Sequence, residues 1–264
     1  MEDDSLPQSR NTSGAVPSKP LCASTEQYVC VLPVLNGDAV TNTMIRAARS
    51  KMSGSLVFVA VQQGDEILAL LPGTIIRSDG VVATCASRLS FRTIKELRVT
   101  VTVEVLNGKV TYEGTLLSAD FSSNIAFIKF TSPGQLKAAP VAKMFATCVL
   151  AVGCTSRGRG LHDTDFNYCL ALTGHRVINR IEINKIENKQ SDARTSGKVI
   201  HAFVQARSGS VIGGPLVRPE LGVIGIIHYE AGRNIIATPI DEVLKYLECL
   251  LEYREQDPKS VVCA

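Results

Sequence analysis

The sequence has no apolar run that approaches the ~20 residues a helix needs to cross a bilayer. Its longest apolar stretches, such as Leu56 to Val61 and Cys148 to Val152, end after a few residues. We therefore expect no integral membrane protein and no membrane partner. The first eight residues, MEDDSLPQ, are acidic and contain no apolar segment typical of a secretory signal. A cytoplasmic or nuclear location is the expectation.

A strong charge of either sign is also missing. The chain carries 28 Lys and Arg against 25 Asp and Glu, which gives a formal net charge of +3. Proteins that bind nucleic acids gather basic residues to neutralise phosphates. Arg157 and Arg159 have no aromatic neighbour on which a base could stack. We expect no nucleic-acid partner.

Metal and redox motifs are absent as well. The eight cysteines form no C-x-x-C pair, and the four histidines form no H-x-x-x-H spacing. Zinc sites commonly use these patterns. In a reducing compartment the cysteines are expected to be thiols that pack as small apolar groups. The sequence predicts no metal and no cofactor.

The composition is that of a globular protein, because 45% of the residues are hydrophobic. Residues 1–26 are rich in Ser, Pro, Asn and Thr and are predicted to be a disordered tail. Asp38 can cap a short helix that ends near Gly54. At the other end, Thr238-Pro239 begins a predicted amphipathic helix over 239–253, and residues 254–264 are predicted to be a flexible tail.

Between these helices the pattern is that of strands. Short runs rich in Val, Ile, Leu, Thr and Phe alternate with turn residues from Ser55 to Ala237. Residues 97–105 alternate with period two, and Asn107-Gly108 leads directly into 109–117, which predicts a hairpin. Many short strands with almost no helix between them indicate an all-β antiparallel sandwich or barrel.

One glycine-rich segment is the most informative. Residues 208–217 read SGSVIGGPLV, and residues 222–226 read GVIGI. This pair resembles the nucleophile loop and following strand of the trypsin-like double β-barrel serine peptidases, particularly the HtrA/Deg branch. The segments at 72–84, 122–129 and 149–153 resemble further motifs of that family in the same order.

The resemblance covers residues 38–252 and implies two six-stranded antiparallel β-barrels, with a short N-terminal helix and a C-terminal helix. The first barrel is expected at about 52–145 and the second at about 146–238.

The three catalytic positions of the family are occupied by other residues. Ser87 stands at the histidine position, Asn124 at the aspartate position and Ile212 at the nucleophile position. A Ser-His-Asp triad needs a hydroxyl, an imidazole and a buried carboxylate. The side chain of Ile212 has no lone pair with which to attack a carbonyl carbon. The resemblance therefore implies a pseudopeptidase with no catalytic residue.

Other residues bear on residual chemistry. Ser210 replaces a glycine whose unusual backbone angles help to form the family's oxyanion hole, so that hole is expected to be impaired. Cys85 and Ser87 are candidate relocated nucleophiles. A weak serine- or cysteine-type endopeptidase is thus the alternative function, although no partner that would activate Cys85 is visible nearby in the sequence.

The predicted function is peptide or protein binding. An extended peptide could pair with an exposed strand edge near residues 222–229 through main-chain hydrogen bonds. The binding candidates are Ser210, Gly213, Ile226, His228 and Tyr229. The sequence leaves the identity of the partner and the oligomeric state open.

Overall fold

The computed structural model describes residues 37–256, apart from 65, 90–96, 106–107, 144–147, 157–163, 180–197 and 205–209. Every described residue belongs to one compact unit, Asn36–Ala264. The predicted tail at 1–26 and most of the predicted tail at 254–264 lie outside the described residues. None of the described helices is long and apolar enough to span a membrane.

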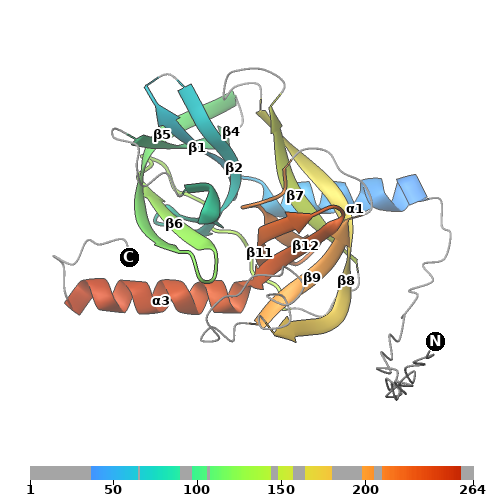
Figure 1. The fold of residues 1–264 in the computed structure, drawn as a ribbon. Coiled ribbons are helices and arrows are strands. Elements are labelled where there is room, and N and C mark those ends of the chain that lie inside the picture. Colours follow the sequence, from blue (N-terminus) through green and yellow to red (C-terminus); the bar gives the residue numbers. More distant parts are fainter. Residues whose placement is uncertain are drawn as a thin grey trace, which may run out of the picture. The chain divides into compact units, whose positions relative to one another are not determined.

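Two closed six-stranded antiparallel barrels form the described unit, as the resemblance predicted (Figure 1). The strands of the first barrel follow one another around it in the order β1-β2-β3-β6-β5-β4. They are β1 (Leu56–Gln63), β2 (Glu66–Arg77), β3 (Val81–Cys85), β4 (Leu97–Val105), β5 (Gly108–Asp120) and β6 (Ile125–Phe130). Strands β4 and β5 form the predicted hairpin, but Val105 pairs with Gly108, so Gly108 is the first residue of β5 and lies outside the two-residue connection.

The second barrel has the order β10-β11-β12-β9-β8-β7. Its strands are β7 (Cys148–Ser156), β8 (Thr164–Asn179), β9 (Lys198–Val204), β10 (Pro215–Arg218), β11 (Gly222–Ala231) and β12 (Asn234–Pro239). Each barrel encloses its own apolar core, which contains Ile75 and Ile128 in the first and Ile224 and Ile227 in the second.

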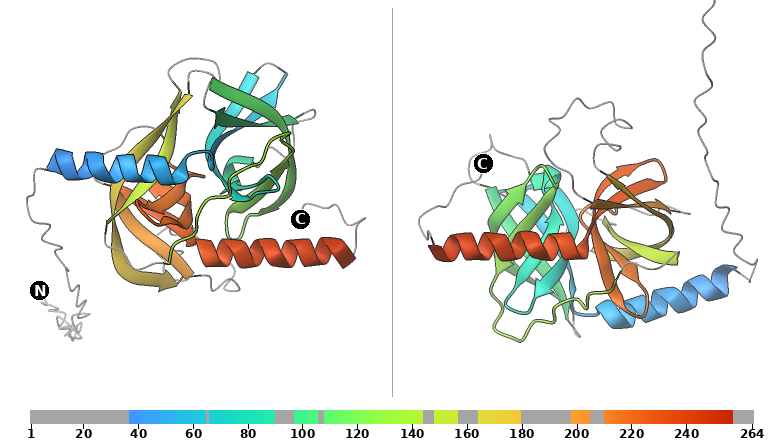
Figure 2. Two further views of the ribbon diagram at one scale, coloured as in Figure 1. Left: turned by 180° about the vertical axis from the view of Figure 1, so that it is seen from behind. Right: turned by 90° about the horizontal axis from the view of Figure 1, so that it is seen from below.

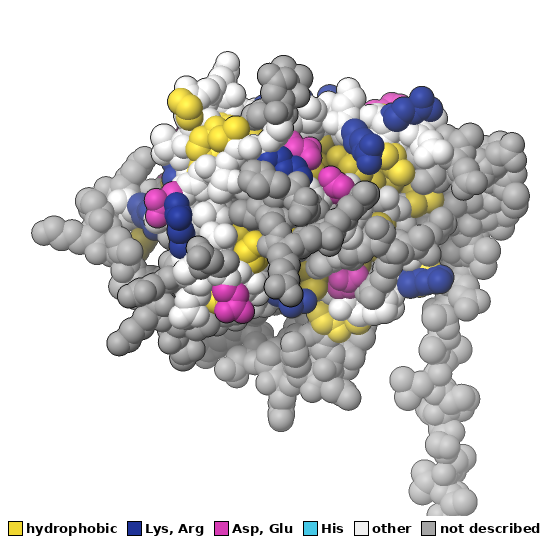
Figure 3. Space-filling view, turned by 90° about the horizontal axis from the view of Figure 1, so that it is seen from above, with side chains coloured by type: hydrophobic (Ala, Val, Ile, Leu, Met, Phe, Trp, Pro, Cys, Tyr) yellow, Lys and Arg dark blue, Asp and Glu magenta, His cyan; other side chains and the backbone are white. Residues whose placement is uncertain are grey.

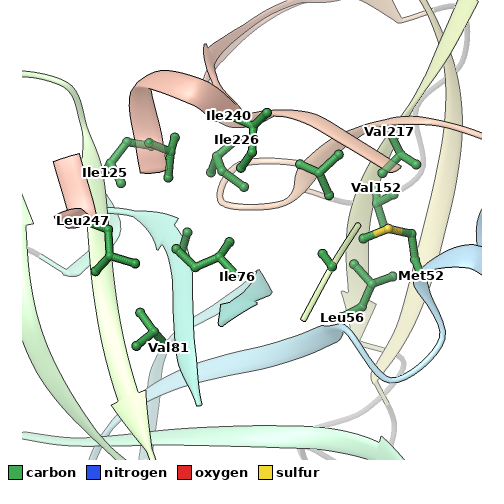
Figure 4. Close-up of a cluster of buried hydrophobic side chains, with 14 of the residues drawn as sticks. Met52, Leu56, Ile76, Val81, Ile125, Val152, Val217, Ile226, Ile240 and Leu247 are labelled. Atoms are coloured by element: carbon green, nitrogen blue, oxygen red, sulfur yellow. The ribbon is translucent and has the colours of Figure 1, made fainter. Parts of the chain in front are cut away.

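A third apolar cluster lies between the barrels (Figure 4). The first barrel contributes Ile76 and Val81, and the second contributes Val152 and Ile226. Helices α1 (Gly37–Met52) and α3 (Ile240–Gln256) add buried side chains, among them Met52 and Leu247. Burial of a side chain of this size stabilises the fold by roughly 1.5–3 kcal/mol. The shared cluster holds the two barrels in contact.

Both helices contact the second barrel, and only α3 continues along the first. Figure 2 shows α1 beside the second barrel and α3 extending along the first. Near its end, α3 is tied to β5 by a hydrogen bond from Arg254 Nη2 to the main-chain oxygen of Leu117, 2.6 Å long. The helix begins at Ile240 and ends at Gln256, within three residues of the predicted bounds. In the view of Figure 3, basic and acidic side chains of described residues are interspersed, in keeping with the balanced composition.

Candidate functional site

The end of β3 and the turn before β6 bring two of the predicted site positions into contact. Cys85 pairs with Ile125 at the end of the β3–β6 ladder. The short 3-10 helix η1 (Ser87–Leu89) follows, and its first main-chain N–H donates to Asn124 Oδ1 at 2.7 Å. Residues 87 and 124 therefore meet although 37 positions separate them.

Asn124 is held in a left-handed conformation with φ of 57°. Asparagine tolerates this region better than most residues. The Asp120 carboxylate supports the turn by accepting the main-chain N–H of Ser122 at 2.7 Å and of Ser123 at 3.2 Å. Burial would raise the pKa of Asp120, but hydrogen bonds from Ser122, Ser123 and Tyr246 outweigh that effect and lower it below its ordinary 3.8.

Both ends of the Asn124 carboxamide are used. Its Oδ1 accepts the Ser87 N–H, and its Nδ2 donates to the main-chain oxygen of His228 at 3.0 Å. The two contacts fix the orientation of the amide because one requires an acceptor and the other a donor. An ionised aspartate accepts hydrogen bonds but donates none, so it would place two acceptor oxygens in contact here. The local geometry suits an amide.

The glycine-rich loop packs against the same place. The Gly214 N–H donates to the Val211 oxygen at 3.0 Å, which closes a turn with Ile212 and Gly213 at its centre. Gly213 has φ of 92°, as the third residue of a type II turn requires. A Cβ added at Gly213 would lie 2.5 Å from Thr84 Oγ1 and 3.4 Å from the Cys85 nitrogen. Ile212 therefore precedes a glycine that packs directly against β3. The side chain of Ile212 is a half-buried hydrocarbon.

Cys85 is the thiol of this region, and it is fully buried. Its Sγ lies 3.1 Å from Ser87 Oγ, 3.4 Å from Asn124 Oδ1 and 3.8 Å from the His228 main-chain oxygen. Within the described part of the chain, neither an imidazole nitrogen nor a cationic group is among its hydrogen-bond partners. Activation of a thiol requires such a neighbour, so these contacts supply no base for it.

The His228 ring is turned toward Thr238. His228 Nδ1 lies 3.0 Å from Thr238 Oγ1, and that hydroxyl donates to the Ser123 main-chain oxygen at 3.3 Å. The Thr238 hydroxyl and His228 Nδ1 form a hydrogen bond whose donor depends on the tautomer of the imidazole. This chain joins the second barrel to the turn that carries Asn124. The sequence does not reveal these hydrogen bonds, because Thr238 is predicted there only as the start of the closing helix.

The model of the trypsin-like peptidase domain family matches residues 72–226, more than half of the chain. The chain belongs to this family. It is also similar to the putative protease Do-like 14 of Arabidopsis thaliana, with 29% identity over 234 residues. That alignment covers 81% of this chain but 49% of the relative, so the chain spans about half the length of that protein.

Ser210 takes a different conformation in this trypsin-like peptidase domain from the one its position suggested. Among the described residues, Asn124 is the single non-glycine residue with positive φ. Ser210 forms an antiparallel bridge with Cys154, and its oxygen accepts the Cys154 N–H at 2.9 Å. The expected strain at Ser210 is absent because the backbone avoids the glycine conformation.

Two of the predicted binding residues of this peptidase domain are buried: Ile226 fully and Tyr229 partly. Ile226 does not fit its predicted role: it is 0% exposed, and it pairs with Pro215 on one side and Thr238 on the other. The run from Val223 to Ile227 is buried on both faces. One face lines the core of the second barrel, and the other belongs to the apolar cluster between the barrels. Tyr229 is half-buried against Val199.

The strand edge expected over 222–229 is largely occupied. Val223 pairs with Val217 and also bridges Val141. Ile227 exchanges hydrogen bonds with the loop, donating to the Gly214 oxygen at 2.8 Å and accepting from the Gly213 N–H at 2.7 Å. Only 228–231 extend past β10. In that stretch, residues 229–231 pair with β12, and the His228 main-chain oxygen accepts the hydrogen bond from Asn124 Nδ2.

The described residues of this domain include no group of three or more His, Cys, Asp and Glu side chains placed to hold a metal ion. Around Asn124, the hydrogen bonds of its own amide join uncharged groups, and the Asp120 carboxylate supports the turn that carries it.

Proposed function

We propose that this trypsin-like peptidase domain is a pseudopeptidase that binds peptide or protein segments. One observation carries the proposal: the Asn124 amide donates to the His228 carbonyl oxygen, at the position that the resemblance assigns to the carboxylate of the triad. In a serine-peptidase triad the carboxylate sets the imidazole tautomer and stabilises the imidazolium, and its conversion to an amide costs on the order of 10⁴ in kcat. Ser87 supplies no imidazole at the histidine position, and Ile212 supplies no nucleophilic atom at the serine position.

The end of β11 supports the binding half of the proposal. Residues 228–231 extend beyond β10, and His228, Tyr229 and Glu230 are half-buried. A peptide in extended conformation adds to such an edge through its main chain, while nearby side chains set its specificity. Tyr229 and Ile212 offer apolar surface to such a peptide.

The alternative is a weak endopeptidase with a relocated nucleophile. The 3.1 Å contact between Cys85 Sγ and Ser87 Oγ favours it by placing two candidate atoms together. However, Cys85 is fully buried, and the groups that contact its thiol are a hydroxyl, an amide oxygen and a carbonyl oxygen. None of these removes a proton at neutral pH, so we favour the inactive form.

Activity-based labelling tests the inactive half. The full chain is incubated, native and denatured, with a fluorophosphonate and with iodoacetamide, alongside an active trypsin-like peptidase as positive control. We expect no fluorophosphonate adduct and no native labelling of Cys85, together with no cleavage of casein. Stoichiometric labelling that disappears on denaturation would establish the endopeptidase instead.

Photo-crosslinking tests the binding half. A photoreactive phenylalanine analogue replaces Tyr229, and the matched control carries it at Tyr253, which is 57% exposed on α3. A diverse library of extended peptides is then irradiated with each protein. Adducts at position 229 that are missing at 253 support the binding edge. If neither protein forms adducts and no partner is recovered in pull-downs, the binding proposal is rejected.

A further inference from the structure

The segment that connects the two barrels has an outward-facing edge. It carries both buried and exposed residues: Ala139 is 8% exposed and Ala142 6%, whereas Val141 is 52% exposed and Lys143 is exposed. Val141 forms an isolated parallel bridge with Val223 of β11. The segment therefore lies against the second barrel at this bridge.

The hydrogen bonds of this bridge show which way its peptide groups point. The Val223 N–H donates to the Pro140 oxygen at 2.8 Å, and the Ala142 N–H donates to the Val223 oxygen at 2.8 Å. In parallel pairing, the residue between these two groups directs its own N–H and C=O to the opposite side. Those groups of Val141 have no hydrogen-bond partner among the described residues. Within the described part of the chain, these two groups of Val141 are available to pair with another strand.

The side chains around this edge are aliphatic and basic. Leu221, 47% exposed, precedes Gly222, and a Cβ at Gly222 would lie 2.0 Å from the Pro140 oxygen. The turn that carries Leu221 therefore packs directly against the segment. The basic residues close in sequence to Val141 and Leu221 are Lys137, Lys143 and Arg218, and the acidic residue Glu220 is exposed. Lys137 Nζ donates to the Lys51 main-chain oxygen at 3.2 Å, so Lys143 and Arg218 are the basic residues considered for binding.

We propose that this linker edge, formed by Val141, Lys143 and Leu221, binds an extended acidic segment of a partner protein that carries an aliphatic side chain. Main-chain groups at Val141 would pair with the partner's main chain, and the basic side chains would attract its carboxylates. A peptide fits better than a lipid surface, because a headgroup offers no alternating donors and acceptors to match a strand edge. The linker edge is separate from residues 228–231 and stands independently of the binding proposed there.

The test is fluorescence anisotropy of the full chain with a labelled, end-blocked peptide of alternating Glu and Val. We expect binding that weakens with added salt, and none with the matched peptide of alternating Lys and Val. Lys143→Glu is expected to weaken binding at least about fivefold, with Lys143→Arg restoring it. Leu221→Ser is expected to weaken binding as well. Lys245→Glu, the same charge change on α3, is the control and should leave binding unchanged.

Hydrogen exchange supplies a second readout. Binding at the linker edge should slow exchange of the Val141 amide proton, and circular dichroism should show that Lys143→Glu remains folded. Equal binding by the wild type and Lys143→Glu, or no binding by either, would overturn the proposal. Binding of phosphatidylserine vesicles in place of the peptide would overturn it in favour of a lipid surface. Crosslinking at Tyr229 should persist in Lys143→Glu, which separates this result from that of the proposed function.

Discussion

The side-chain nitrogen of Asn124 and the main-chain oxygen of His228 lie 3.0 Å apart, although 104 residues separate them in the chain. This hydrogen bond joins the turn before β6 in the first barrel to β11 in the second. With the contact from Thr238 to Ser123, it connects the two barrels around the turn that carries Asn124. The Asn124 amide therefore has a structural role at this position, because its nitrogen donates across the barrels.

Asn124→Asp should destabilise the protein at neutral pH. The carboxylate would face the His228 oxygen without a proton to donate, and the unsatisfied contact is expected to lower the free energy of unfolding by about 1–3 kcal/mol. Urea denaturation measures the change. Asn42→Asp, on the exposed side of α1, is the matched control and should stay within about 0.5 kcal/mol of the wild type. Equal stability of Asn124→Asp and the wild type would show that the amide donor is not needed.

Gly213→Ala should be more damaging than the same change at Gly64. Both glycines have positive φ, 92° and 57°, so alanine is strained at either. Only at Gly213 would the new Cβ meet other atoms, 2.5 Å from Thr84 Oγ1 and 2.8 Å from the Pro72 oxygen. We expect a loss of about 1 kcal/mol for Gly64→Ala and at least about 2 kcal/mol more for Gly213→Ala, in thermal or urea denaturation. Similar losses would mean that the loop is not seated on β3.

Stability should fall in acid partly through Asp120. Its pKa is lowered in the folded state, because hydrogen bonds from Ser122, Ser123 and Tyr246 outweigh desolvation. A carboxyl with a depressed folded pKa stabilises the protein above its unfolded pKa of about 3.9, and this contribution is lost as pH falls through the folded value. Asp120→Asn should therefore be less stable than the wild type at pH 7, and the difference should shrink below about pH 4. The control Glu113→Gln, on the exposed face of β5, should show no such convergence. A difference constant with pH would contradict this account.

Ile212→Ser should not restore proteolysis. The new hydroxyl would stand in the turn at 211–214, but position 87 carries a serine and Asn124 carries no charge, so no base is supplied for it. We expect neither fluorophosphonate labelling nor casein cleavage above the wild-type level. Labelling of Ile212→Ser, but not of Ile212→Ala, would reveal a base that these contacts do not show.

The sequence predicted individual strands and hairpins well because their signals are local, whereas the two closed barrels were implied by the family resemblance. Alternation along 97–105 and the turn at Asn107-Gly108 involve residues close in the chain, and both match the β4–β5 hairpin. The prediction that Ile226 contacts a bound peptide failed because burial by distant strands is not a local signal. A continuous apolar run such as 223–227 indicates a strand, but it does not reveal that both faces are covered and both edges paired.

The sequence by itself determined which chemical groups are available: a hydroxyl at Ser87, an amide at Asn124 and a hydrocarbon at Ile212. Side-chain identity alone fixes which groups can donate, accept or attack. Only the tertiary structure decided what these groups contact, including the His228 oxygen beside Asn124 and the Thr238 hydroxyl beside the His228 ring. Such contacts depend on distances of about 3 Å and on direction, and the packing of two barrels through a shared core sets both.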